Sequence, residues 1–325
     1  MVRRIISPQG VLLFVTLLWA STFSVADEIL HSTPPLLYLT ARFVPAALVM
    51  LCYTFFYPDS NHNISMKQQR KHSLFADTLY LSVLQTFALL LQVWGQKFIP
   101  PARSAFLTAV SVPLVPILGW LIYRKRPTYF QLIAAFLGLL GQMLITYPIG
   151  QDFSWNIGDL LTFASAILIA LIILETSRRV PHHPIKQFAS LQTLFMAIFY
   201  ALLLAIVFLR PSVFPSALLE FELAPMISST RIWMLILYMG IVCTVFTFFL
   251  QTWSMSKLNP TQAAIILAIE PVFAAAIEFV MKGKIKWNGM YATFGAVLIC
   301  SALIISEFRP ASLPKESIEP SGPVS

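Results

Sequence analysis

Ten apolar runs, each about 20 residues long, follow one another along this sequence of 325 residues. A helix of about 20 apolar residues crosses a bilayer core that is about 30 Å thick. Charged residues make up only 11% of the chain, whereas a soluble domain carries about a quarter. No run alternates with the period of a membrane β-strand, so the spans are predicted to be helices, which bond every backbone group internally. The predicted spans are 11–30, 34–57, 74–96, 102–123, 128–147, 157–177, 187–209, 231–253, 261–281 and 288–306. The fold class is therefore all-α, a polytopic membrane protein.

The two ends of the chain need separate treatment. The first run resembles a signal peptide, because Arg3 and Arg4 precede it and Ser24-Val25-Ala26 fits a cleavage pattern. Cleavage would leave nine helices and remove the counterpart of the sixth span, so we keep this run as a helix. Residues 310–325 are rich in Pro and Ser, and they are predicted to form a disordered cytosolic tail.

Lys and Arg residues are unevenly distributed between the two sides of the predicted bundle. With the N-terminus in the cytosol, 14 of them fall inside and 7 outside, while Arg42 lies within a span. Because cytoplasmic loops carry the excess of basic residues, both termini are predicted to be cytosolic. Topology thus accounts for most of the net charge of +8, and no nucleic-acid partner is needed. We expect a multi-pass protein of a bacterial cell inner membrane.

One segment of the chain occurs twice. The stretch "LLLQVWGQKFIPP" (89–101) returns as "FFLQTWSMSKLNP" (248–260), a shift of 159 residues. The residues that recur are Leu91 as Leu250, Gln92 as Gln251, Trp94 as Trp253 and Pro101 as Pro260. Five spans separate the copies, and because five is odd the second copy must lie upside down. The sequence therefore predicts two inverted five-helix repeats, 1–150 and 151–309, as in many secondary transporters whose site lies near mid-membrane between the repeats.

Prolines interrupt the fourth and ninth predicted spans close to their middles. Pro113 and Pro271 each remove one helix hydrogen bond and free the carbonyl four residues earlier, in Ala109 and Leu267. Matching interruptions in the two halves indicate a binding site between the repeats. The alternative is that both prolines only produce packing kinks.

Three motifs resemble a known family. "LLWASTF" (17–23), "ARF" (41–43) and "NPTQAAIILAIEPVFAA" (259–275) are similar to EamA-type members of the drug/metabolite transporter superfamily, and the resemblance covers about residues 10–306. It implies a ten-helix secondary transporter. Members often export amino acids, other metabolites or drugs, and some exchange nucleotide-type metabolites or import their substrates.

The links after the fourth and ninth spans depart from the family pattern. Family members usually carry a glutamate there, but "YRKRPT" (123–128) and "MKGKIKW" (281–287) place Arg126 and Lys284 at these points. The chain therefore carries more positive charge than typical family members near both mouths of the expected transport pathway. The gating details of the family do not transfer directly to this chain.

Two charged residues lie well inside predicted spans. Glu270 is at mid-membrane, where a charge costs roughly 2.5–3.5 kcal/mol, so it is predicted to be protonated or paired. It either titrates during transport, faces a cationic substrate group, or caps the backbone beside Pro271. Arg42 is its candidate partner and either binds a substrate carboxylate or phosphate or forms a structural ion pair. Glu175 and Glu278 lie nearer helix ends and are predicted to be interfacial.

Uncharged polar residues at similar depths complete the candidate substrate site. Each one alone is more typical of a helix–helix contact, whereas together they are expected to converge on the repeat interface. They are Trp19, Ser21, Thr22, Gln85, Thr86, Thr108, Ser111, Ser165, Tyr238, Thr244 and Thr247.

The sequence contains no ATP-binding loop, no catalytic motif and no metal-ligand spacing, so we expect neither an enzyme nor a cofactor. The predicted function is secondary transport of a small polar metabolite by alternating access, with export or exchange expected. Amino acids or related compounds are the first expected substrates, and nucleotide-like compounds, amines and drugs are the alternatives. Protons or a counter-substrate are the expected coupling partners, and the protein is a monomer or dimer. A receptor or scaffold without flux, or a membrane-embedded transferase, remains the alternative.

Overall fold

The computed structural model describes residues 7–56, 73–124, 126–146, 155–210, 229–270, 272–274, 276–277 and 289–307. The predicted tail (310–325), Pro271, Glu278 and Lys284 lie outside these residues. The described chain is helical and contains no strand. Its elements are α1 (Pro8–Leu30), α2 (Pro35–Phe56), α4 (Leu74–Gln96), α5 (Pro101–Ala109), α6 (Ser111–Tyr123), α7 (Tyr129–Thr146), α8 (Ile157–Arg179), η2 (Val180–His182), α9 (Ile185–Leu209), α11 (Thr230–Gly240), η5 (Ile241–Phe246), α12 (Thr247–Met255), α13 (Pro260–Leu267) and α15 (Gly289–Glu307).

The all-α, polytopic architecture is confirmed. Among the described residues, seven helical stretches are long and apolar enough to cross a bilayer, and shorter apolar helices at α7, α13 and α15 supply the remaining spans. Local chemistry sets where these helices begin. At the start of α8, the Asn156 side chain accepts from the Asp159 N–H at 3.1 Å, and the Asp159 carboxylate accepts from the Asn156 N–H at 2.7 Å. This reciprocal capping satisfies donors that a helix start leaves unpaired.

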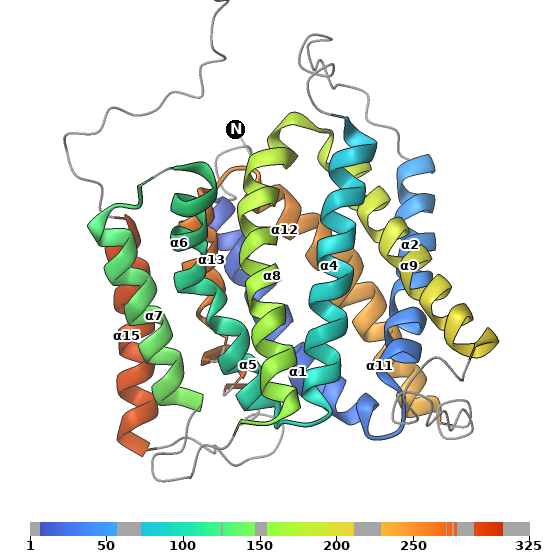
Figure 1. The fold of residues 1–325 in the computed structure, drawn as a ribbon, viewed down its shortest axis with the longest axis horizontal. Coiled ribbons are helices and arrows are strands. Elements are labelled where there is room, and N and C mark those ends of the chain that lie inside the picture. The colour runs from blue at the N-terminus through green and yellow to red at the C-terminus, as the bar shows by residue number, and fades with distance from the viewer. Residues whose placement is uncertain are drawn as a thin grey trace, which may run out of the picture.

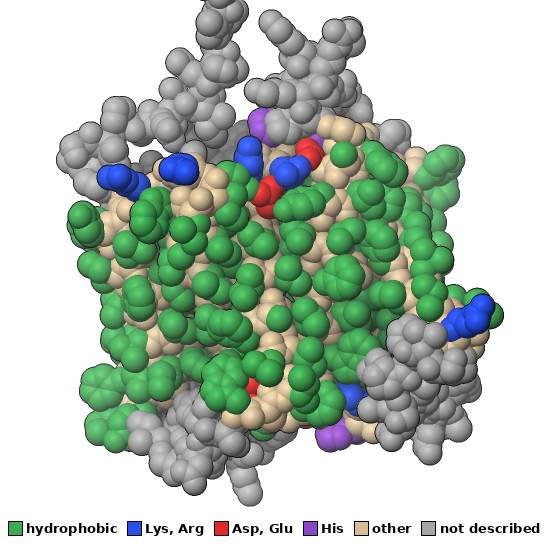
Figure 2. Space-filling model, viewed as in Figure 1, with side chains coloured by type: hydrophobic (Ala, Val, Ile, Leu, Met, Phe, Trp, Pro, Cys, Tyr) green, Lys and Arg blue, Asp and Glu red, His purple; other side chains and the backbone are tan. Residues whose placement is uncertain are grey.

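Apolar side chains cover the flank of the bundle. Figure 2 shows hydrophobic side chains across the middle of one face, with Lys and Arg gathered mainly toward its upper edge. Phe87 of α4, Leu160 of α8 and Leu202 of α9 are among the exposed apolar residues. An apolar patch of this extent would be unstable in water, so lipid is the solvent of this surface and the chain is a multi-pass membrane protein.

The two copies of the repeated segment have the same local structure. α4 ends at Gln96 and α5 begins at Pro101, while α12 ends at Met255 and α13 begins at Pro260, each pair offset by 159 residues. Proline fits the first turn of a helix because its missing N–H would be unpaired there anyway. In Figure 1 the α4–α5 connection lies at the lower end of the bundle and α12 approaches the upper end. The chain is thus built of two inverted five-helix repeats.

Helix packing follows this internal symmetry. α4 packs along α8, and the equivalent pair in the other copy is α12 with α1, while α2 packs on α9 and α7 on α15. The α7–α15 crossing depends on two glycines. A Cβ atom on Gly141 would lie 2.5 Å from the Gly295 carbonyl oxygen, and one on Gly295 would lie 2.4 Å from that of Gly141. The backbones are therefore in direct contact, as small residues allow in membrane helix pairs.

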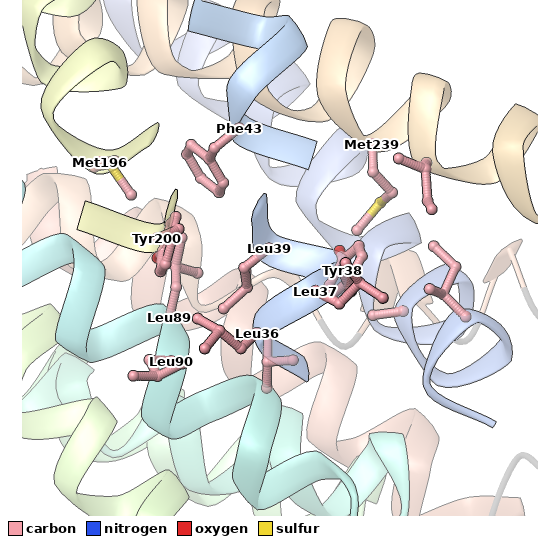
Figure 3. Packing of buried hydrophobic residues seen from close by; sticks show 14 of the residues in the cluster. Leu36, Leu37, Tyr38, Leu39, Phe43, Leu89, Leu90, Met196, Tyr200 and Met239 are labelled. Atoms are coloured by element: carbon pink, nitrogen blue, oxygen red, sulfur yellow. The ribbon is translucent and has the colours of Figure 1, made fainter. Parts of the chain in front are cut away.

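The largest buried cluster joins α2 to α9 and α11. Figure 3 shows Phe43, Met196 and Tyr200 converging between α2 and α9, with Tyr38 and Met239 on the other side of α2. The rings of Phe43 and Tyr200 lie 5.2 Å apart, centroid to centroid. This packing fixes the rotation of α2 about its axis and so determines where Arg42 points.

Candidate functional site

Arg42 lies inside the bundle and binds neutral partners. Its side chain is 2% exposed. Nε donates to the Thr244 hydroxyl at 2.8 Å, one terminal nitrogen donates to the Tyr38 hydroxyl at 3.1 Å, and the other to the Cys243 carbonyl at 2.8 Å. The guanidinium carbon also lies 5.6 Å from the Trp19 ring centroid and 5.4 Å from that of Phe43. The site thus supplies hydrogen bonds and ring contacts to a cation, but no opposite charge.

A π-helical segment presents the partners of Arg42. In η5, the Thr244 hydroxyl donates to the Met239 carbonyl five residues earlier, at 2.9 Å. Thr247 donates to the same Cys243 carbonyl that accepts from Arg42, at 2.8 Å. A Cβ atom on Gly240 would lie 3.0 Å from the Arg42 carbonyl oxygen, so the two backbones nearly touch. π-Segments within α-helices are frequent at functional sites, and this one directs two oxygens at the guanidinium.

Five acids of the described chain pair with bases other than Arg42. Glu28 pairs with Arg231, and Asp27 lies 3.9 Å from His31. The remaining ion pairs join Asp77, Glu175 and Asp159 to Arg179 or Arg103. Within the residues that the structure describes, Arg42 therefore has no carboxylate partner. Burying an unpaired charge costs several kcal/mol. An anionic group that reached Arg42 would offset this cost, so the position favours an anionic ligand.

The predicted pair of Arg42 with Glu270 is wrong for the described chain. Glu270 is partly buried, and its carboxyl has no partner among the described residues. The helix that leads to Glu270, α13, packs on α1, α6, α7, α8 and α15. In contrast, α2 packs on α1, α4, α9, α11 and η5, so α1 is the neighbour that α2 and α13 have in common.

Polar residues of α1 extend the Arg42 site. Ser21 Oγ lies 2.7 Å from the Tyr238 hydroxyl and 3.8 Å from the Cys243 sulfur, and it also bonds the Leu18 carbonyl. Thr22 instead donates to the Trp19 carbonyl at 2.7 Å, within its own helix. The structure thus brings five of the predicted residues, Trp19, Ser21, Tyr238, Thr244 and Thr247, into one group around Arg42, whereas the Thr22 hydroxyl bonds within α1.

A small polar cavity adjoins Trp19. The space open to the centre of a water molecule is about 20 Å³, enough for about one water but too small for a metabolite. Its lining comes from α1, α4, α8, α9 and α12 and carries no charged side chain. The lining residues are Trp19, Gln85, Ile172, Thr176, Gln192, Phe248, Gln251, Thr252 and Met255. Gln192, Gln251, Thr176 and Thr252 were not predicted, because the sequence gives their depth but not the direction in which they point.

Other predicted site residues lie in helix–helix contacts. Ser165 of α8 donates to the Ala88 carbonyl of α4 at 2.7 Å, and Thr108 of α5 accepts from Gln92 of α4 at 2.9 Å. Ser111 is buried at the start of α6. The hydroxyl of Thr86 is buried without a partner in the described chain, although its carbonyl accepts from Tyr200 at 3.2 Å. None of these four predicted residues lines the cavity.

The backbone is interrupted in the fourth and ninth spans, although Pro271 itself lies outside the described residues. The fourth span is interrupted at Val110, three residues before Pro113, where α5 ends and α6 begins. In the ninth span, α13 ends at Leu267 and the next carbonyl, that of Ala268, accepts from Gln142 of α7 at 2.8 Å. A carbonyl released by the break is therefore satisfied by a side chain of a neighbouring helix.

Buried ion pairs link helices at both ends of the bundle. Where α4 begins and α8 ends, Arg179 binds both Asp77 and Glu175, and His183 Nε2 lies 2.8 Å from the other Asp77 oxygen. Where α4 ends and α8 begins, the two nitrogens Nε and Nη2 of Arg103 lie 2.6 and 2.7 Å from the carboxylate of Asp159. Glu175 lies near the end of α8, as predicted from its place in the span, and is 5% exposed because it packs inside the bundle, where the nearby guanidinium compensates its burial. Arg126 is exposed in the link before α7.

Comparisons with known proteins agree with this architecture. A model of the EamA-like transporter family matches residues 9–147 and 156–307. An "uncharacterized transporter" of Archaeoglobus fulgidus is 26% identical over 313 residues, which are 95% of this chain and 88% of that protein. The "uncharacterized transporter YoaV" of Bacillus subtilis is 21% identical over 297 residues, covering 90% of this chain and 94% of that protein. A solved structure of 15% sequence identity superposes with a TM-score of 0.68 over 92% of this chain and 96% of its own, which shows a shared fold.

Proposed function

Because the chain belongs to the EamA-like transporter family of the drug/metabolite transporter superfamily, we propose that it is a secondary transporter that moves a small polar metabolite by alternating access. The observation that carries this proposal is the buried guanidinium of Arg42, which is bound only to neutral groups of the described chain and lies against the aromatic wall of a polar cavity. A substrate carboxylate would supply the missing negative charge. Amino acids and related carboxylates are therefore the first candidates, moved by export or exchange.

The small size of the cavity supports alternating access. Its volume of about 20 Å³ leaves no room for a metabolite, so a substrate requires a conformation in which helices separate. Ion pairs join helices at both ends, through Asp77 and Arg179 at one and Arg103 and Asp159 at the other. We propose that each end opens in turn, as inverted repeats permit when they exchange equivalent conformations. We further propose that both termini are cytosolic, in a bacterial inner membrane.

Counterflow tests transport directly. The full chain, reconstituted in vesicles preloaded with an unlabelled compound, is expected to accumulate the same labelled compound faster than empty vesicles. The panel contains amino acids, hydroxy acids, nucleotides and amines, and vesicles without protein are the control. If a folded protein exchanges no compound of this panel, the chain is a receptor or scaffold and the proposal is overturned.

Glu270 is the proposed coupling residue. No ATP-binding motif is present in the sequence, so uphill movement must use an ion gradient or exchange. Glu270 is an acid beside a helix break with no partner among the described residues, which suits a group that takes up and releases a proton. Glu270→Gln is expected to keep exchange of the substrate but to lose the dependence of net uptake on a pH gradient.

The measurement is uptake in vesicles with and without an imposed pH gradient, and thermal unfolding serves as the folding control. If uptake by the variant still depends on the pH gradient, another group couples transport to protons. If uptake by the wild type does not depend on the gradient, protons are not the coupling ion. Loss of folded protein would instead assign Glu270 to the structure of the helix break.

A further inference from the structure

We propose that the cavity lined by Gln85, Gln192 and Gln251 binds an uncharged hydrogen-bonding group of the substrate, and that Arg42 binds the carboxylate of the same molecule. This inference rests on the proposed transport function and narrows its carboxylate candidates to those that carry no ammonium group, so that zwitterionic amino acids are no longer the first choice. The substrate is a small monoanionic carboxylate that also carries an amide, hydroxyl or carbonyl group.

The side-chain amides of Gln85 and Gln192 are the first evidence for a polar ligand in the cavity. Gln192 is 5% exposed and Gln85 is half-buried, and both line the cavity. Neither side-chain amide has a hydrogen-bond partner among the described residues. Each amide offers two donor hydrogens and one acceptor oxygen. Buried polar groups are nearly always hydrogen-bonded, so these amides require a ligand or water in the space that they face.

The third amide is oriented by Trp19. The Trp19 indole N–H donates to Gln251 Oε1 at 2.8 Å, which leaves the Gln251 amino group available as a donor. Thr176 and Thr252 also line the cavity. Donors and acceptors thus surround the cavity from α4, α8, α9 and α12, and no lining side chain is charged. An uncharged polar group can be matched here, whereas a second charged group would find no counter-charge.

Trp19 lines the cavity and also lies close to the charged guanidinium of Arg42. The same indole that lines the cavity lies 5.6 Å from the guanidinium carbon of Arg42. Arg42 has one positive charge and no carboxylate partner in the described chain, so one negative charge on the substrate balances it. A carboxylate matches the planar guanidinium and carries one charge. A molecule that spans Trp19 would place its anionic end at Arg42 and its uncharged end at the amides.

Simple matched compounds test this substrate class. Succinamate and glutaramate each carry a carboxylate and an amide, while butanoate and pentanoate lack the amide and the corresponding diamides lack the charge. Binding to the purified full chain is measured as a ligand-induced rise in unfolding temperature, which mass action converts to affinity. We expect succinamate or glutaramate to bind about tenfold more tightly than the plain carboxylate of similar length, because the amide gains hydrogen bonds in the cavity. The diamides are expected not to bind.

Substitutions of glutamines test whether the cavity binds the amide group of the ligand. Gln192→Leu is expected to remove the tenfold preference for the amide compound and to leave binding of butanoate or pentanoate unchanged. Gln85→Leu is the second variant, in case the first does not fold. Gln92→Leu is the matched control, because Gln92 has the repeat position of Gln251 but bonds to Thr108 and lies outside the cavity lining. It should keep the preference.

Several results would overturn the inference. These are equal binding of the amide and plain carboxylates, a preference for a diamide or 4-aminobutanoate, and tighter binding of inorganic phosphate. Failure of all the carboxylates, while counterflow detects another compound, would reject this substrate class and leave the transport function intact. Absence of counterflow for every compound would instead reject the transport function itself.

Discussion

Arg42→Met is expected to reduce carboxylate transport by about 100-fold while the protein remains folded. The buried guanidinium is the cation that a substrate carboxylate would meet, and methionine retains much of its volume without its charge. Replacement of a buried charge by an apolar residue of similar size is often neutral or stabilising, because the cost of burying the charge disappears. The unfolding temperature is therefore expected to stay constant or rise.

Arg42→Lys is the matched variant for this test. Lysine keeps the charge but cannot reach Thr244, Tyr38 and the Cys243 carbonyl together as the planar guanidinium does. Transport by this variant is expected to lie between that of the wild type and that of Arg42→Met. Counterflow and thermal unfolding are measured on the same preparations. A large loss of stability with Arg42→Met would show that Arg42 serves to join α2 to η5 and would contradict a substrate role.

Arg179→Met is expected to lower the free energy of unfolding by about 3 kcal/mol, the largest stability effect that we predict. Arg179 binds both Asp77 and Glu175, which are 4% and 5% exposed. Its removal takes a positive charge away from two buried carboxylates, of which Asp77 keeps His183 at 2.8 Å. An uncompensated buried charge is costly, so the contact between α4 and α8 at this end should weaken.

The adjacent arginine provides the control. Arg178 is exposed and lies 4.5 Å over the ring of Tyr123, so Arg178→Met should change stability by less than about 1 kcal/mol. Chemical or thermal unfolding in detergent measures both variants. Equal effects of the two substitutions would mean that the buried ion pairs contribute no more than a surface contact. A loss confined to Arg179→Met would support closure of this end by the cluster.

The repeated segment shows how much of the structure could be predicted from the sequence. The motif predicted the inverted repeats, and the structure places Pro101 and Pro260 at the first turns of equivalent helices. The two glutamines of the motif, however, have different partners. Gln92 donates to Thr108 of its own repeat, whereas Gln251 accepts from Trp19 of the other repeat. The residues that the two copies share therefore cannot tell which glutamine faces the cavity.

The sequence by itself determined the all-α fold, the apolar spans and their inversion, and it predicted a depth for each polar residue. These follow from the length of apolar runs, from helix-starting residues and from an odd number of spans between the copies, which are all local properties. The rotation of each helix was not determined, because lipid is as apolar as the protein core and both faces of a helix carry similar residues. Only the tertiary structure decided that Arg42 meets η5 rather than Glu270, that Arg179 reaches Asp77, and that Gln192 faces the cavity. Such contacts join residues far apart in the chain, and they depend on how packed helices turn toward one another.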